Sequence, residues 1–379
     1  MAKAKSFTLK TFFSRPLVER LGRDLARVDP RFSERRFVKD ASAGLESLEL
    51  VERARHIGRA LATHLPGPYP EALRVLLRSL GPELSGDEII GAGMAPFYYL
   101  PHLSFVAERG LEHFDASLKA QYELTKRMSA ESSMRAYLAL DPERTFRTLE
   151  RWANDANPHV RRLVSECTRP RLPWAARVAW LDAHPERVLA LLARLKDDSS
   201  PMVRRSVANN LNDFARLIPE LVVRTCASWL RAPTEERRAL VEHALRGAVK
   251  RGDAGALRLL GFGGKPAVAL EAIRFEPKRV AIGGRVTVSF ELRSRSRESQ
   301  ALLVDLAVHF VKANGGSAPK VFKLKRITLP ARGRCRLDAN VSLAVHTTRV
   351  PRPGAHAVDV LVNGRTLHAG TFLVGPPGQ

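Results

Sequence analysis

The chain has 379 residues and a formal net charge of +23, with 62 Lys and Arg against 39 Asp and Glu. This length allows two or three domains with full cores, and such a basic excess is typical of proteins that bind polyanions. Three cysteines are too few for a disulfide framework or a cysteine metal site, and no apolar run approaches the roughly 20 residues of a membrane span. We therefore expect a reduced, cytoplasmic protein with no metal and no membrane segment.

The first two thirds of the chain are predicted to be helical. Apolar residues recur at helical spacing from the start, for example Phe13, Leu17 and Leu21. After a helix predicted over residues 115–126, the stretch SAESSMRAYLAL begins another, with Ser129 as its N-cap. That cap would place Glu131 in the first helical turn, where the helix dipole would keep its carboxylate ionised.

One helical unit is written twice between Asp141 and Asp213. Its three landmarks recur at a single offset of 43 residues, in the pairs Pro142 and Pro185, Pro158 and Pro201, and Arg161 and Arg204. A helix, a turn and a second helix repeating at this period are typical of the HEAT and armadillo class of helical solenoids.

A third, degenerate copy follows, in which Arg237 lies only 33 residues after Arg204. The first copy is therefore longer by about one loop, and the surplus is TRPRLPW at residues 168–174. Trp174 in this loop is interpreted either as a packing anchor or as a contact to a ligand.

The second helix of each copy carries polar residues among its apolar ones. Ser206, Asn210 and Asp213 form a stripe apart from the apolar stripe of the same helix. In the first copy Arg162 and Glu166 are four residues apart, as in a helix salt bridge. From the pattern alone, these carboxylates are either a functional site or solvated ion pairs.

After Gly264 the periodicity changes from helical to alternating. Val286, Val288, Phe290 and Leu292 share one face, and Asn363-Gly364 between two apolar runs predicts a tight hairpin. We expect about seven strands. Residues 264–379 carry 19 Lys and Arg against 7 Asp and Glu, a net +12. The fold class is therefore predicted as an all-α solenoid of HEAT-like repeats over residues 1–263, followed by a small, basic, all-β immunoglobulin-like sandwich over residues 264–379.

Long stretches of the chain closely resemble the AlkC branch of the HEAT-repeat alkylpurine DNA glycosylases. They are SAESSMRAYL (129–138), ERTFRTLERWANDANPHVRRLVSECTRPRLPWAARV (143–178), VRRSVANNLNDFAR (203–216) and FVKANGGSAPKVFKLKRITLPARG (310–333). The resemblance implies a monofunctional DNA N-glycosylase for base excision repair of alkylation damage. Such an enzyme hydrolyses the N-glycosidic bond of cationic alkylated bases in duplex DNA, chiefly 3-methyladenine. The resemblance also implies that the enzyme needs no cofactor and acts as a monomer on the bacterial nucleoid.

Carried over residue by residue, the resemblance assigns the catalytic acidic residue to Glu131, the second carboxylate to Asp213 and the active-site tryptophan to Trp174. Glu166 lies in a matching motif and is expected to bind substrate. Further expected contacts to substrate or DNA are Arg161, Arg162, Arg204, Arg205 and Asn210. One departure is that Ser132 and Ser133 stand where bulkier, more apolar residues are expected.

Two other functions remain open. The chain could be a non-enzymatic HEAT-repeat scaffold on DNA, in which Glu131 and Asp213 form only ion pairs, or a HEAT adaptor for an acidic protein. Release of free methylated base separates the glycosylase from both alternatives. A steep dependence of duplex binding on salt separates the two alternatives from each other.

Overall fold

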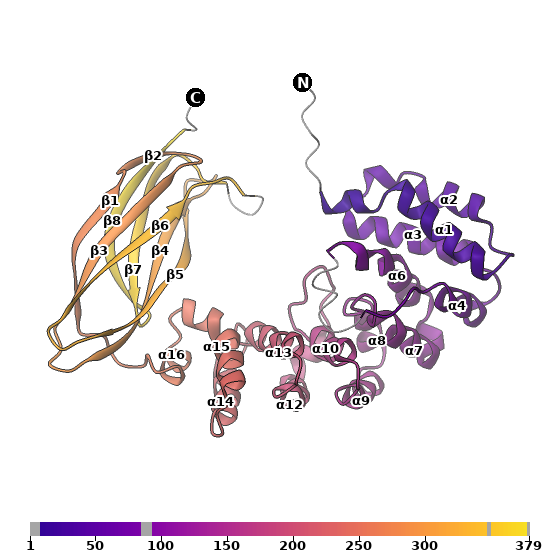
Figure 1. The fold of residues 1–379 in the computed structure, drawn as a ribbon, viewed down its shortest axis with the longest axis horizontal. Coiled ribbons are helices and arrows are strands. Elements are labelled where there is room, and N and C mark those ends of the chain that lie inside the picture. The colour runs from indigo at the N-terminus through magenta and orange to yellow at the C-terminus, as the bar shows by residue number, and fades with distance from the viewer. Residues whose placement is uncertain (1–7, 85–92, 347–349, 377–379) are drawn as a thin grey trace. The chain divides into compact units, whose positions relative to one another are not determined.

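The structure is a computed structural model that describes residues 8–84, 93–346 and 350–376 (Figure 1). The chain divides into two compact units, one formed by residues 1–217 and 232–244 and the other by residues 218–231 and 245–379. The first unit consists of helices, and a β-sandwich makes up most of the second.

Fifteen α-helices lie in the described part of the chain. They are α1 (Arg15–Val28), α2 (Glu34–Ser42), α3 (Leu50–His64), α4 (Tyr69–Arg78), α6 (Leu100–Arg109), α7 (Phe114–Thr125), α8 (Met134–Leu140), α9 (Pro142–Trp152), α10 (Pro158–Cys167), α11 (Ala179–Ala183), α12 (Pro185–Leu195), α13 (Pro201–Phe214), α14 (Pro219–Trp229), α15 (Glu235–Lys250) and α16 (Ala254–Leu259). None of these helices is long and apolar enough to cross a membrane.

The repeated helix pairs predicted from the proline landmarks are confirmed as α9 with α10 and α12 with α13. Each of the four helices begins at its proline. Proline is tolerated there because an N–H group in the first turn has no hydrogen-bond partner within the helix. Two side chains then bind free N–H groups of the first turn. The carboxylate of Asp141 accepts from the backbone of Arg144, and the amide oxygen of Asn157 accepts from the backbone of His159.

Helices α10 and α13 pack against each other, and each buries an apolar stripe. Leu163 and Val164 of α10 are fully buried, as are Val207 and Leu211 of α13. Burial of each such side chain contributes about 1.5–3 kcal/mol. The packed stripes hold the adjoining polar positions of the two helices at a fixed separation.

The C-terminal part folds as a sandwich of two sheets. Its eight described strands are β1 (Val268–Glu276), β2 (Arg279–Ala281), β3 (Arg285–Ser294), β4 (Gln300–Val311), β5 (Ser317–Leu329), β6 (Arg334–Ser342), β7 (Gly354–Val362) and β8 (Arg365–Gly375). One sheet has the order β1-β3-β6 and the other β2-β8-β7-β4-β5. The prediction of about seven strands is one short. A strand of three residues such as β2 shows too little alternation to be recognised.

Side chains from both sheets form the core of the sandwich. The predicted inward set Val286, Val288, Phe290 and Leu292 is buried, which confirms the alternation. The predicted hairpin is also confirmed, because Asn363 and Gly364 have φ of 47° and 77° and join the antiparallel pair β7 and β8. The predicted division after residue 263 falls between α16 and β1 and stays a prediction.

Candidate active site

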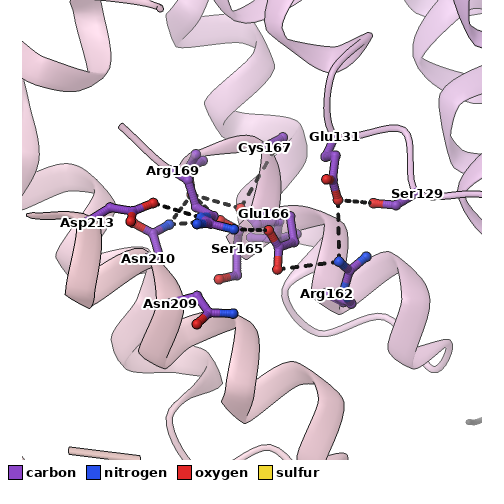
Figure 2. Close-up of polar contacts among 12 residues, drawn as sticks. Ser129, Glu131, Arg162, Ser165, Glu166, Cys167, Arg169, Asn209, Asn210 and Asp213 are labelled. Carbon is purple, nitrogen blue, oxygen red and sulfur yellow. Dashed lines mark hydrogen bonds and ion pairs between the residues drawn. The ribbon is translucent and has the colours of Figure 1, made fainter. Parts of the chain in front are cut away.

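Glu131 lies in the turn before α8. Its carboxylate accepts a hydrogen bond from the Ser129 hydroxyl at 2.7 Å and lies 3.4 Å from the guanidinium of Arg162 (Figure 2). The prediction that Ser129 caps a helix holding Glu131 in its first turn is wrong, because α8 begins only at Met134 with Ser133 before it. Glu131 is therefore held by a hydroxyl and a guanidinium.

Burial raises the pKa of the Glu131 carboxyl above its ordinary value of 4.5. Arg162 opposes this shift and the nearby carboxylate of Glu166 adds to it. A quarter of the side-chain surface, 25%, is still exposed, so the group is desolvated by its surroundings while remaining open to a ligand. The expectation that a helix dipole stabilises the ionised form is wrong.

From Glu131 a chain of alternating charges runs through α10 to α13 (Figure 2). Arg162 lies 3.4 Å from both Glu131 and Glu166. Arg169 then binds Glu166 at 3.0 Å and Asp213 at 2.8 Å. We call these five side chains the carboxylate cluster. The structure thus brings together the three predicted acidic residues, which lie on three different elements.

The cluster holds three carboxylates against two guanidinium groups, within a protein of net charge +23. The side chains of Glu166 and Asp213 are only 5% and 10% exposed. Burial disfavours the charge on Arg169, yet Glu166 and Asp213 together raise the pKa of its guanidinium. Within these five side chains carboxylates outnumber guanidinium groups by one, and this favours a cationic ligand.

Arg169 is the residue of the cluster that sequence reasoning missed. It lies in the surplus loop, three residues after Glu166. The loop is held by Arg135, which is 4% exposed and donates to the backbone oxygens of Cys167 and Arg169 at 3.1 and 2.9 Å. The available signal was the extra length of this loop next to a predicted site residue.

Trp174 lies farther along the same loop. It is 64% exposed, which disfavours the packing-anchor interpretation, and its φ of 59° is unusual for a bulky residue. Together with Ser129 and Ser132 it lines a groove of about 360 Å³. Ser129, which lines this groove, also donates to Glu131, so the groove and the carboxylate cluster share this one neighbour.

Asn210 and two of the predicted arginines are engaged within the protein. The Asn210 amide donates to the backbone oxygen of Ser165 at 2.8 Å and joins α13 to α10. Arg161 makes two bonds to the Asp198 carboxylate at 2.6 and 2.9 Å, and Arg204 donates to the backbone oxygen of Ser199 at 3.1 Å. The Arg204 contact stabilises the turn before its own helix, and the Asn210 and Arg161 contacts join neighbouring helix pairs.

Arg205 differs from these two arginines because it is exposed. It lines an open groove between α13 and α15 together with Glu235 and Glu236. Arg204 lines the same groove but is half-buried, as Arg161 and Arg162 are, so Arg205 is the one exposed side chain among the four predicted DNA-binding arginines. In the described ranges no three His, Cys, Asp or Glu side chains gather where they could hold a metal ion.

Comparison with known proteins decides the family. The chain is 35% identical to the Pseudomonas fluorescens alkylpurine DNA glycosylase AlkC, solved with DNA that contains an abasic-site analogue. The two structures agree with a TM-score of 0.89, over 97% of this chain and all of that one. The chain belongs to the AlkC family.

Two further similarities agree with this membership. The Bacillus subtilis (strain 168) protein named "Uncharacterized protein YhaZ" is 32% identical over 369 residues, which covers 97% of this chain and 99% of that protein. The family model for the C-terminal Ig-like domain of YhaZ matches residues 269–376. The predicted resemblance to the AlkC family is confirmed, and the sandwich is immunoglobulin-like.

Proposed function

We propose that the chain is a DNA repair glycosylase that hydrolyses the N-glycosidic bond of cationic alkylated bases in duplex DNA, chiefly 3-methyladenine. The carboxylate cluster carries the proposal, because it places net negative charge on an otherwise basic protein. The AlkC relative was solved on DNA with an abasic-site analogue, which is the kind of product such a reaction leaves.

The chemistry of the substrate explains why carboxylates suffice. An N3-alkylated adenine already carries positive charge, so it leaves without a general acid to protonate it. As the C1′–N bond breaks, its electron pair stays with the base and neutralises it, and positive charge develops on the sugar. Carboxylates stabilise an oxocarbenium-like sugar of this kind.

In our assignment Glu131 and Asp213 share the two remaining tasks, stabilising the sugar cation and orienting the attacking water. Water adds its oxygen to C1′, and one of its protons passes to a carboxylate. We assign the exposed ring of Trp174 to the same region, where its face would attract a cationic base by about 0.5–2 kcal/mol. Glu166 is placed between the two arginines and would keep them aligned.

We assign a monofunctional reaction without a cofactor. The described side chains of the cluster are carboxylates and guanidinium groups, whereas cleavage of the DNA strand through a Schiff base needs an amine. The partner would be duplex DNA bound by a monomer, and access to chromosomal DNA implies a cytoplasmic, nucleoid-associated protein. We further assign the helical region to a solenoid of HEAT-like repeats, supported by the 43-residue recurrence of α9 and α10 in α12 and α13.

The test is chromatography of the bases released from methylated duplex DNA. A glycosylase releases free 3-methyladenine and leaves the DNA strands intact. A non-enzymatic scaffold binds the duplex with a steep salt dependence and releases no base. An adaptor for an acidic protein does neither.

A further inference from the structure

A basic groove lies on helices that do not carry Glu166 or Asp213. It is an open groove of about 710 Å³ formed by α7, α9, α12 and the turn after α9. In Figure 1, α9 and α12 lie on one side of the helical region, while α10 and α13, which carry Glu166 and Asp213, lie on the other. The proposed reaction does not use this groove.

Four guanidinium groups line the groove, those of Arg144, Arg147 and Arg151 from α9 and that of Arg194 from α12. Two of them are oriented by neighbours on α9. Arg151 donates to the Thr148 hydroxyl at 3.1 Å, and Arg194 donates to the backbone oxygen of Glu150 at 3.4 Å. Arg147, Arg151 and Arg194 are exposed.

The opposing negative charge is smaller. Two carboxylates, those of Asp115 and Glu150, reach the groove. Asp115 is bound by Arg144 at 2.7 Å, and the same guanidinium lies 4.3 Å from the centre of the Phe114 ring. The groove therefore presents an excess of positive charge to solvent.

The spacing of the arginines matches a nucleic-acid backbone. Arg144 and Arg151 are seven residues apart, which is about 10.5 Å along a helix axis. One strand of a duplex carries a phosphate about every 3.4 Å of its axis, so the stripe is about as long as three phosphate intervals, which join about four successive phosphates. Every side chain that lines the groove is polar or charged, unlike the apolar centre of a protein interface.

We propose that this arginine groove is a second nucleic-acid site, which binds the phosphates of a DNA segment other than the one held at the carboxylate cluster. Such contacts are electrostatic and independent of base sequence. One protein molecule would then hold two DNA segments at once, and this would favour transfer between segments during a search for damage.

The test uses the full-length protein saturated with an unlabelled duplex that contains an abasic-site analogue. A short, labelled, undamaged duplex is then added, and its binding is followed by fluorescence anisotropy at several salt concentrations. The variant is the double substitution R147Q/R194Q. The matched control is R23Q/R35Q, which removes the same charge from exposed positions on α1 and α2.

We expect the saturated wild type and R23Q/R35Q to bind the second duplex. In R147Q/R194Q its affinity should fall about tenfold, and the log–log salt slope should flatten by about 2. Affinity for the abasic-site duplex should be the same in all three proteins. The proposal is wrong if the saturated wild type takes up no second duplex, or if R147Q/R194Q binds it as well as R23Q/R35Q. Base release is measured separately, so a failure of the glycosylase assignment would be seen independently.

Discussion

The carboxylate cluster shows which parts of a site can be predicted at the level of single residues. Resemblance placed Glu131, Glu166 and Asp213 in matching motifs, and the structure brings these three together. It could not reveal Arg169, because that contact depends on how the surplus loop folds against α13. The wrong prediction that Ser129 is a helix N-cap has a similar cause, because the turn around Ser133 determines where α8 begins. The roles of these residues in catalysis stay predictions.

Arg169 is expected to act as a positioning residue. Its loss would leave Asp213 without its guanidinium partner and Glu166 with only Arg162, so Asp213 would be free to turn away from the substrate. Arg169→Gln should lower the single-turnover rate of base release by at least about tenfold, or about 1.4 kcal/mol of barrier, with little change in the enzyme concentration that gives half-maximal rate. The control is Arg171→Gln, in the same loop but paired with Asp182 at 3.6 Å. Equal rates for the two variants would contradict the assignment.

The raised pKa of Glu131 predicts a particular pH dependence. Protonated Glu131 cannot stabilise a sugar cation, so the rate should fall as the pH is lowered through a pKa above 4.5. This acid limb should be absent in Glu131→Gln. Folding raises the pKa of Glu131, so its ionised carboxylate lowers the free energy of unfolding at pH values above the folded pKa. Below the unfolded pKa the group is protonated in both states, and this destabilisation is absent. Glu131→Gln should then be at least as stable as wild type at neutral pH. An acid limb that persists in the variant would assign the titration to another group.

At the scale of elements, the proline landmarks predicted the helix starts because a proline constrains one backbone position whatever its tertiary surroundings. The Asn363-Gly364 turn was predictable for the same reason. The role of the repeated arginines was not predictable, because it lies in contacts that only the folded chain makes. Arg161, Arg204 and Arg237 each donate to a backbone oxygen of the turn before their own helix, and two of them also bind a neighbouring unit. Arg161 binds Asp198 of the next helix pair, and Arg237 binds Asp197 of the preceding pair.

Arg161 is therefore expected to be important for stability. Its partner Asp198 retains only 4% of its side-chain exposure, so removing the guanidinium leaves a buried carboxylate without its charge partner. Arg161→Gln should lower the free energy of unfolding by about 3 kcal/mol in urea denaturation. The exposed Arg205→Gln should leave it unchanged. If Arg161→Gln instead unfolds like wild type but loses affinity for DNA, the DNA-contact prediction from the sequence is right and the structural role is wrong.

At the scale of the whole molecule, the charge of +23 predicts a polyanionic partner but cannot say which surfaces meet it. The structure adds one detail within the sandwich. Strand β5 is the edge of its sheet and carries exposed Lys320, Lys323 and Lys325. A lysine-lined edge strand discourages pairing with other strands, and it also presents a row of cations. We propose that this edge contacts phosphates of the bound duplex.

The variant K323Q/K325Q tests that contact. If each lysine neutralises one phosphate, the log–log salt slope of duplex binding should flatten by about 2. Base release at low salt should persist, because the carboxylate cluster is made by residues of the helical unit. A salt slope equal to that of wild type would show that these lysines contact no phosphate.

In our proposal, Glu131 and Asp213 act on the sugar and the water. The most direct measurement is single-turnover release of 3-methyladenine from duplex DNA by wild type, Glu131→Gln and Asp213→Asn. Each substitution removes a charge while keeping the size of the side chain. We predict that each lowers the rate by at least about tenfold, while affinity for a duplex with an abasic-site analogue changes little. Wild-type rates in both variants would contradict the account, and the carboxylate cluster would then be a set of structural ion pairs.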